Sequence, residues 1–301
     1  MPHQIRSFLD EGISLSYEVF GRGERTVVYL HGMLLDSAIN HRLAEDLAAA
    51  GYRVVLLDLP GHGRSDKPHA IVQHRMDAYA HRVVRLLDEL GVERAVVGGV
   101  SLGADVSLQL ALAAPERLVG MILEMPVLEQ AMPAALVVFA PVLFAATYAA
   151  PVVRAMVRLA RRLPRRRLGV LGALMGMVEL DPDDMAAVLR GVVVGPFAPT
   201  VPERVSMTVP ALVIGHSSDR LHPLGDAARL SAQLPDARFV EARSVLELRL
   251  RPARLTGEIL SFLDTAFETG HAWRPEKPNT ARRPDIQRGI SRRARGGRGT
   301  V

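Results

Sequence analysis

Apolar runs alternate with longer segments of helical spacing along the first 270 residues of this 301-residue chain. Strands that are covered on both faces of a sheet show near-continuous runs of this kind. The runs predict strands at 26–32, 52–60, 94–100, 118–125, 210–216 and 237–243. Residues 12–21 alternate between apolar and polar positions instead, which predicts an antiparallel strand at the edge of the sheet.

The segments between these strands predict helices at 36–51, 77–91 and 102–115. The first of them begins with Asp36, a typical N-cap residue, and ends at Gly51, a typical C-terminal residue. A chain that repeats strand, helix and strand folds into a parallel sheet with right-handed crossovers. The fold class is therefore α/β, with a mostly parallel central sheet of about eight strands flanked by helices.

A serine lies between glycines in the stretch VVGGVSLGAD, residues 96–105. Gly99 and Gly103 give Ser101 the spacing G-x-S-x-G, directly after a predicted strand and before a predicted helix. In this context the spacing is typical of a sharp turn that presents a nucleophilic hydroxyl at the carboxyl end of a central strand. The N–H of Leu102 at the helix start would point to where an oxyanion develops.

Three further stretches occur in an order that is specific to one family. They are LHGM at 30–33, DLPGHGRSDKP at 58–68 and PALVIGHSSDRLHP at 210–223. With the serine turn, they make residues 12–268 resemble the α/β-hydrolase superfamily. The resemblance implies that Met33 supplies a second oxyanion N–H and that Asp219 is the catalytic acid. For His31, His62, Asp58 and Asp66 we expect a role in ordering loops.

The histidine that this superfamily carries after its last strand is missing. The usual position falls near Ser244 or Val245, and no histidine occurs from 223 to 270. A serine hydroxyl needs a neighbouring base to be a good nucleophile at neutral pH. His222, three residues after Asp219, is the best candidate, and the alternative is a histidine that only shapes the pocket.

Two other residues are alternative candidates for the base and the acid of this site. His216 adjoins the end of a strand and is a weaker candidate for the base. Glu124 ends the preceding strand, and some family members place their acid there, so Glu124 is an alternative to Asp219.

An apolar insertion interrupts the core where the superfamily carries its lid. We expect the core at 1–125 and 206–268 and a helical lid at 126–205. Residues 131–153 carry no charge but contain three prolines, which favours a lid of broken helices over a membrane span. A series of arginines follows, at 154, 158, 161, 162, 165, 166 and 167. Its alternatives are a solvated helix face and a weak contact with an anionic membrane surface.

The amino-acid composition excludes several classes of site and shows where the positive charge lies. The chain has no cysteine, which excludes disulfides, thiolate metal sites and a cysteine nucleophile. Residues 271–301 hold eight Arg and one Lys against two acids, so the positive charge belongs to this end of the chain. The segment at 269–301 is predicted to be a basic disordered tail. The start of the chain does not resemble a secretory signal, and we expect a cytoplasmic location.

These features predict a serine hydrolase that acts on an apolar ester through Ser101 and an acyl-enzyme, in the manner of esterases and lipases. The expected partner is an apolar small molecule. We expect no cofactor, no metal and no nucleic acid for the core, and the sequence leaves the oligomeric state open. The alternative is a non-hydrolytic relative, a binding protein, lyase, isomerase or cyclase, that holds an apolar molecule.

Overall fold

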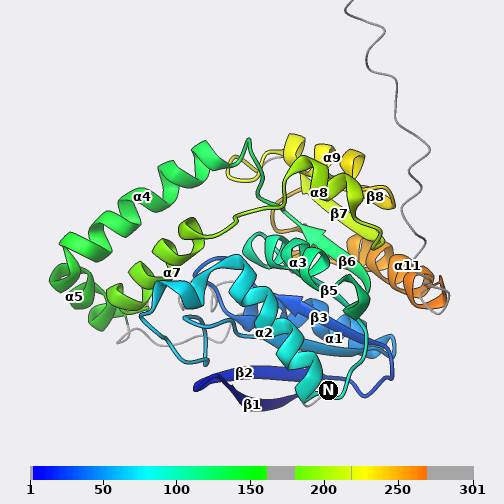
Figure 1. The fold of residues 1–301 in the computed structure, drawn as a ribbon, viewed down its shortest axis with the longest axis horizontal. Helices are drawn as coiled ribbons and strands as arrows, with labels where there is room; N and C mark the ends of the chain where they lie inside the picture. Colours follow the sequence, from blue (N-terminus) through cyan, green and yellow to red (C-terminus); the bar gives the residue numbers. More distant parts are fainter. Residues whose placement is uncertain (1–2, 161–179, 218, 270–301) are drawn as a thin grey trace, which may run out of the picture. The chain divides into compact units, whose positions relative to one another are not determined.

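The computed structural model describes residues 3–160, 180–217 and 219–269 of the chain. An eight-stranded sheet forms its centre, in the order β1-β2-β4-β3-β5-β6-β7-β8 (Figure 1). The strands are β1 (Gln4–Asp10), β2 (Ile13–Phe20), β3 (Thr26–Leu30), β4 (Arg53–Leu57), β5 (Ala95–Val100), β6 (Leu118–Glu124), β7 (Ala211–His216) and β8 (Ala237–Ala242). From β4 to β8 all neighbours are parallel. The predicted α/β class and the approximate strand number are confirmed.

The amino-terminal edge of the sheet differs from the prediction in one respect. Strand β2 is antiparallel to its neighbours, as expected, but it pairs with both β1 and β4 and is therefore not an edge strand. The edge is β1, which the hydrophobic pattern did not reveal. Most of its side chains are exposed, and Leu9 is exposed although it is apolar. A two-residue connection at Glu11 and Gly12, both with positive φ, turns the chain back into β2.

Helices cover both faces of the sheet, as Figure 1 shows. On one face lie α1 (His41–Ala49) and α11 (Ala253–Thr269), and on the other lie α2 (Met76–Glu89), α3 (Leu102–Ala113) and α9 (Leu224–Gln233). Each face has its own cluster of buried apolar side chains. This two-sided burial explains why the strands read as continuous apolar runs.

The predicted helix at 36–51 is divided into two parts. Asp36 caps a 3₁₀ turn, η1 (Ser37–Asn40), by accepting a hydrogen bond from the N–H of Ala38 at 3.1 Å. Helix α1 begins only at His41. Two other short 3₁₀ turns, η2 (Ile71–His74) and η3 (Pro115–Arg117), lie before α2 and after α3.

A helical insertion lies between β6 and β7. Its described helices are α4 (Met132–Tyr148), α5 (Ala150–Ala160), α7 (Pro182–Val194) and α8 (Val201–Ser206). The uncharged run is broken once, between α4 and α5, whereas Pro141 lies inside α4. Among the described helices none is by itself long and apolar enough to cross a membrane, although α4 and α5, bent by 100°, pass that test as a pair. The boundaries of the predicted lid remain a prediction.

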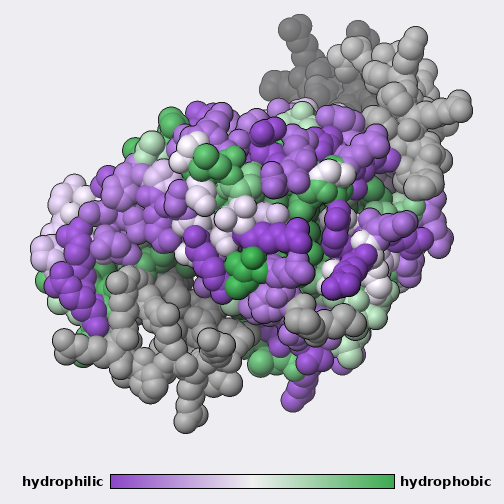
Figure 2. Space-filling model, turned by 90° about the horizontal axis from the view of Figure 1, so that it is seen from below, coloured by the Kyte–Doolittle hydropathy of each residue, from purple (hydrophilic) through white to green (hydrophobic). Residues whose placement is uncertain are grey.

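Some predicted features lie outside the described residues. These are the basic tail beyond Thr269 and the arginines at 161, 162, 165, 166 and 167. The short helix α10 (Glu247–Leu250) separates β8 from α11. On the face shown in Figure 2, the described residues form a largely hydrophilic surface in which hydrophobic side chains occur in small groups. On this face, burial of apolar side chains by the covering helices leaves mainly polar groups in contact with solvent.

Candidate active site

Ser101 occupies the sharp turn between β5 and α3 that the sequence predicts. Its backbone has φ 53° and ψ −112°, a conformation that non-glycine residues rarely adopt. Glycines make the turn possible because the backbones cross closely here. A Cβ on Gly99 would lie 2.7 Å from the carbonyl oxygen of Leu30, and a Cβ on Gly103 would lie 2.7 Å from the same atom. The hydroxyl of Ser101 therefore projects from a fixed and strained position.

The side chains of Ser101, His222 and Asp219 form one hydrogen-bonded chain. His222 Nε2 lies 2.9 Å from Ser101 Oγ, and His222 Nδ1 lies 2.7 Å from Asp219 Oδ2. Because a carboxylate can only accept, Nδ1 carries the proton and Nε2 is free to accept from the serine hydroxyl. The structure thus brings together the three residues that the sequence nominated, with the ring of His222 in the orientation that a general base requires.

One short turn holds both Asp219 and His222, the candidate acid and base. Asp219 Oδ1 accepts hydrogen bonds from the N–H groups of Leu221 at 2.8 Å and His222 at 3.1 Å. Burial opposes the ionisation of Asp219, but the hydrogen bonds from the side chain and backbone of His222 and from Leu221 outweigh it and lower the pKa of Asp219. The ionised form of Asp219 is therefore stabilised next to Nδ1 of His222.

Two backbone N–H groups are candidates for an oxyanion hole. Leu102 is the first residue of α3, and the first N–H groups of a helix have no partner within it. Met33 follows β3 in the turn at 31–35, and both residues line the cavity next to Ser101. The helix dipole of α3 adds a partial positive charge at the same place.

The four residues for which the sequence predicts a role in ordering loops do make hydrogen bonds within and between loops. His31 Nε2 accepts from the N–H of Leu59, and His62 Nδ1 donates to the carbonyl of Pro60. Asp58 accepts from the N–H groups of Ser37 and Arg64. Asp66 accepts from the N–H of Ser14. Among the described residues, no group of three or more His, Asp or Glu side chains is arranged to hold a metal ion.

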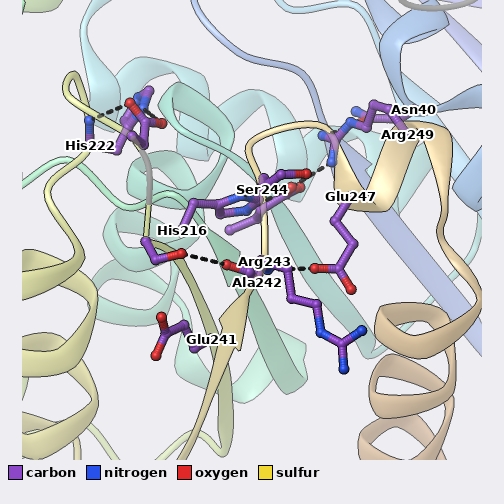
Figure 3. A network of polar contacts seen from close by, with 12 residues as sticks. Asn40, His216, His222, Glu241, Ala242, Arg243, Ser244, Glu247 and Arg249 are labelled. Carbon is purple, nitrogen blue, oxygen red and sulfur yellow. Dashed lines mark hydrogen bonds and ion pairs between the residues drawn. The ribbon is translucent and has the colours of Figure 1, made fainter.

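Glu124, the alternative acid, is engaged in a buried network instead of contacting His222. Its carboxylate is fully buried, lies 2.5 Å from Arg249 Nη1 and accepts from the hydroxyl of Tyr29 at 3.0 Å. Burial opposes ionisation, but Arg249, with His216 3.4 Å away, lowers the pKa of Glu124 to about 2. Arg249 also donates to Asn40, as Figure 3 shows.

The loop after β8, where the superfamily usually has its histidine, supports this network. Ser244 offers its backbone carbonyl to Nδ1 of His216 at 2.9 Å, and Figure 3 shows the His216 ring beside Ser244. Glu247 accepts from the N–H of Arg243 and from Arg254. His216 is thus held by a carbonyl, and its ring is fully buried rather than placed beside a nucleophile.

A cavity of about 520 Å³ opens beside Ser101. Its walls come from the loops after β3, β6, β7 and α7, from η2, and from helices α2, α3, α4 and α7. Most of the lining side chains are apolar: Met33, Ile71, Met76, Leu102, Val127, Met132, Ala135, Leu136, Phe139, Ala140, Leu143, Leu189, Val192, Val193, Val194, Phe197 and Leu221. The polar side chains in the lining are Ser101, Asp105, Arg190 and His222.

Sequence reasoning did not single out Asp105, which is fully buried one helical turn after Ser101. The signal was present, because Asp105 is an acid within the otherwise apolar segment LGADVSLQLALA of α3. Burial raises the pKa of Asp105 well above its usual value. Burial therefore favours the neutral form of this carboxyl group.

A family model for the alpha/beta hydrolase fold matches residues 25–156. A 2-hydroxy-6-oxononadienedioate/2-hydroxy-6-oxononatrienedioate hydrolase of Pseudomonas putida is 44% identical over 108 residues, which cover 35% of this chain and 37% of that protein. The acetyltransferase component of an acetoin cleaving system from Cupriavidus necator is 39% identical over 117 residues, which cover 39% and 30%. The chain thus spans less than two fifths of these two curated relatives.

Solved structures match over nearly the whole described chain. The enol-lactonase from Burkholderia xenovorans superposes with a TM-score of 0.70 at 23% identity, covering 86% of this chain and all of that one. A thermophilic esterase from Thermogutta terrifontis gives 0.68 at 22% identity, covering 87% and 99%. At this identity the likeness shows the fold. Together with the sheet order, it shows that the chain has the α/β-hydrolase fold, and residues 25–156 match the model of the family that bears this name.

Proposed function

We propose that this protein is a serine hydrolase that cleaves an apolar ester through an acyl-enzyme on Ser101. The observation that carries the proposal is the pair of contacts made by His222, at 2.9 Å to the serine hydroxyl and 2.7 Å to the carboxylate of Asp219. A serine with a positive φ at the start of a helix is in a conformation that costs energy. Its presence beside an oriented base supports a chemical role.

In the acylation half-reaction, Ser101 Oγ attacks the ester carbonyl carbon and its proton passes to Nε2 of His222. Asp219 stabilises the imidazolium through Nδ1–H. The N–H groups of Met33 and Leu102 stabilise the oxyanion, which is commonly the largest single contribution to catalysis of this kind. When the tetrahedral intermediate collapses, the carbon–oxygen bond of the ester breaks and His222 gives its proton to the leaving alcohol.

In the deacylation half-reaction, a water molecule takes the place of the alcohol. His222 Nε2 accepts a proton from the water as it attacks the acyl carbon, and the same N–H groups hold the second oxyanion. Collapse returns the proton to Ser101 Oγ and releases the carboxylic acid. The side chains of His222 and Asp219 are mostly buried, at 11% and 8% exposure, which limits the access of solvent to the hydrogen bond between them.

The cavity favours an apolar acyl chain over a diacid. The P. putida relative acts, by its name, on a dienedioate, which has two carboxyl groups. In this chain the only cationic side chain in the described lining is Arg190, which is exposed and donates to Thr147. Aliphatic and aromatic side chains make up most of the wall, as is typical of a site that takes an apolar ligand.

Covalent labelling of purified protein with a fluorophosphonate tests this proposal. We expect one adduct per chain, located by mass spectrometry on the peptide that contains Ser101, together with turnover of p-nitrophenyl esters. Ser101→Ala should abolish both. His222→Ala should slow labelling without changing the unfolding midpoint, and His69→Ala, an exposed histidine distant in sequence from the turn, serves as the matched control.

Absence of labelling from neutral to alkaline pH would overturn the proposal. If esters bind and raise the melting temperature of both wild type and Ser101→Ala, yet neither turns them over, the non-hydrolytic alternative gains support. Equal turnover in the two proteins would assign any activity to a different site.

A further inference from the structure

Helix α4 is apolar on two faces, and only one of them lines the cavity beside Ser101. The cavity face holds side chains at helical spacing: Met132, Ala135, Leu136, Phe139, Ala140 and Leu143. A second face is exposed to solvent and holds Val137, Pro141, Phe144 and Tyr148. Phe144 and Tyr148 are 65% and 76% exposed, and their ring centroids are 4.9 Å apart. A helix that is apolar all round is normally covered on every side, so the outer face of α4 has the composition of a covered surface.

Helix α5 continues this exposed surface beyond the bend that follows α4. Val152, Met156 and Leu159 recur at intervals of four and three, so they lie on one face of α5, and all three are exposed. Both helices pack on α7, which in turn packs on η2 of the core, so α4 and α5 lie on the outer side of the insertion (Figure 1).

The exposed apolar side chains of these two helices form what we call the outer patch. Its members are Val137, Phe144, Tyr148, Val152, Met156 and Leu159. Apolar side chains that are exposed singly are normal on protein surfaces, whereas several on consecutive helices indicate an interaction surface.

The outer patch lies beside the opening of the cavity. Four apolar residues of the cavity wall are themselves exposed: Ile71, Leu136, Val193 and Val194. Because these side chains both line the cavity and contact solvent, they lie where the cavity opens. Leu136 belongs to α4 and precedes Val137 of the outer patch. The exposed apolar surface therefore leads from the outer side of α4 to the cavity.

The charges that follow the outer patch decide which partner fits it. Residues 131–178 contain seven arginines and no acidic residue. Two of these arginines lie in α5, where Arg154 pairs with Asp181 and Asp183. Arg158 is exposed and makes no ion pair within the described part of the chain. Anionic lipid attracts arginines beside an apolar helix face, whereas two copies of a cationic surface repel each other. The charge therefore favours an anionic membrane surface over a second copy of this chain.

We propose that the outer patch is a docking surface for a membrane that contains anionic lipid, with α4 and α5 lying at the boundary between lipid and water. The apolar side chains enter the headgroup region, Tyr148 keeps its hydroxyl in contact with water, and Arg158 contacts a lipid phosphate. Docking brings the opening of the cavity to an apolar phase in which an apolar ester dissolves. The proposal concerns binding and goes beyond the proposed hydrolysis.

Flotation of purified protein with phospholipid vesicles tests the docking surface. One set of vesicles is phosphatidylcholine alone, and the other contains about one third phosphatidylglycerol, which is anionic. We expect wild type to float with the anionic vesicles and more weakly with the neutral ones. The double variant Phe144→Gln, Met156→Gln should bind anionic vesicles about 10-fold more weakly or worse, because two apolar side chains no longer enter the lipid. Arg158→Gln should weaken binding to anionic vesicles alone, by about 5-fold.

Two substitutions outside the outer patch are matched controls. Leu250→Gln removes an apolar side chain that is 66% exposed, against 64% for Met156, and Arg251→Gln removes an exposed arginine. Neither should change vesicle binding, and thermal unfolding checks that every variant is folded. Wild type that floats with neither set of vesicles would overturn the proposal. A folded double variant that floats as well as wild type, or controls that lose as much binding, would do the same.

Two further measurements separate docking from other roles of α4 and α5. Retention on the vesicles through an alkaline carbonate wash would show insertion into the bilayer and overturn docking at its surface. In analytical ultracentrifugation, a dimer that the double variant dissociates, in a protein that does not float, would assign the outer patch to a second copy instead.

Vesicle binding is also separable from the chemistry at Ser101. Ser101→Ala should float as wild type does, and the double variant should turn over a short soluble ester at the wild-type rate when no vesicles are present. Ester turnover without flotation would remove the docking surface and leave the proposed hydrolase intact. Flotation that depends on Phe144 and Met156, in a protein that hydrolyses no ester, would keep the docking surface and remove the proposed hydrolase.

Discussion

The buried pair of Glu124 and Arg249 offers a sharp test of how the sheet end beneath Ser101 is held. Both side chains are buried, at 0% and 7% exposure, and the backbone carbonyl of Glu124 accepts from the N–H of Ser101 at 2.8 Å. Arg249→Met removes the cation and keeps similar length. The carboxylate would then remain buried with only the hydroxyl of Tyr29 and the more distant His216 beside it.

Two independent considerations give the expected loss of unfolding free energy in Arg249→Met. Lowering the pKa of Glu124 from 4.5 to about 2 corresponds to about 3 kcal/mol of stability at pH 7. Breaking a buried ion pair by removing one partner typically costs about 3–5 kcal/mol. We therefore expect Arg249→Met to lower the free energy of unfolding by about 3 kcal/mol at pH 7.

The loss of stability caused by Arg249→Met should depend on pH, and the direction of that dependence follows from the pKa of Glu124. Because the folded-state pKa of Glu124 is lowered, its contribution in wild type is fully present above pH 4.5 and is lost as the pH falls toward about 2. In Arg249→Met the buried carboxyl loses its cation, so its pKa rises and protonation relieves the penalty. The stability difference between the two proteins should therefore shrink as the pH falls from the raised pKa of Glu124 in the variant toward the wild-type value of about 2.

Urea denaturation followed by circular dichroism at several pH values measures this difference. Arg251→Met is the control, since Arg251 is an exposed arginine two residues away and its substitution should change stability by no more than about 0.5 kcal/mol. The double variant Glu124→Gln, Arg249→Met should recover part of the loss. A cost below about 1 kcal/mol for Arg249→Met, or a cost that does not change with pH, would refute the reasoning.

The remaining predictions concern the proposed catalytic groups. His222→Ala should lower kcat by about 100-fold or more, because general-base catalysis contributes at least that much, and changed substrate preference with turnover retained would reduce His222 to a pocket residue. Asp219→Asn should lower kcat by a similar factor or more while KM changes little, since an amide cannot select the Nδ1–H tautomer; unchanged kcat would exclude Asp219 as the acid. Gly103→Ala should destabilise the protein by about 1–3 kcal/mol in thermal unfolding and slow labelling of Ser101, because the new Cβ would lie 2.7 Å from Leu30 Cβ; an unaltered melting temperature would contradict the crowding described for this turn.

The fold could be predicted from the sequence because its strongest signals are local. The buried parallel strands are continuous apolar runs, and helices α1 and α2 are followed closely by Gly51 and Gly91. Strand β1 could not be found in this way, because most of its side chains are exposed and form no apolar face that a sequence pattern could reveal. It exists because its backbone pairs with β2, which is a long-range property.

The site was predictable to the extent that topology sets it. The sequence places Ser101 and the loop after β7 at the same edge of the sheet, and this nominated Asp219 and His222 without fixing a distance between them. The contact depends on the turn at 219–222, where two backbone hydrogen bonds to Asp219 orient the ring. Asp105 was missed because its burial depends on Val127 and Asp226, which are 22 and 121 positions away.

The position of Asp219 and His222 in a single turn distinguishes this site from the superfamily pattern. In the superfamily pattern that the sequence resembles, the acid and the base come from loops after different strands, whereas here Asp219 and His222 share one turn after β7. The loop after β8 no longer needs to present a base toward Ser101, and its carbonyl at Ser244 and the side chain of Arg249 hold His216 and Glu124 instead. The orientation of His222, the proposed base, thus depends on the turn at 219–222. The position of Ser101, the proposed nucleophile, depends on the buried strand ends. Substitutions in the turn should therefore change kcat with little effect on stability, and substitutions in the Glu124 network should change stability first.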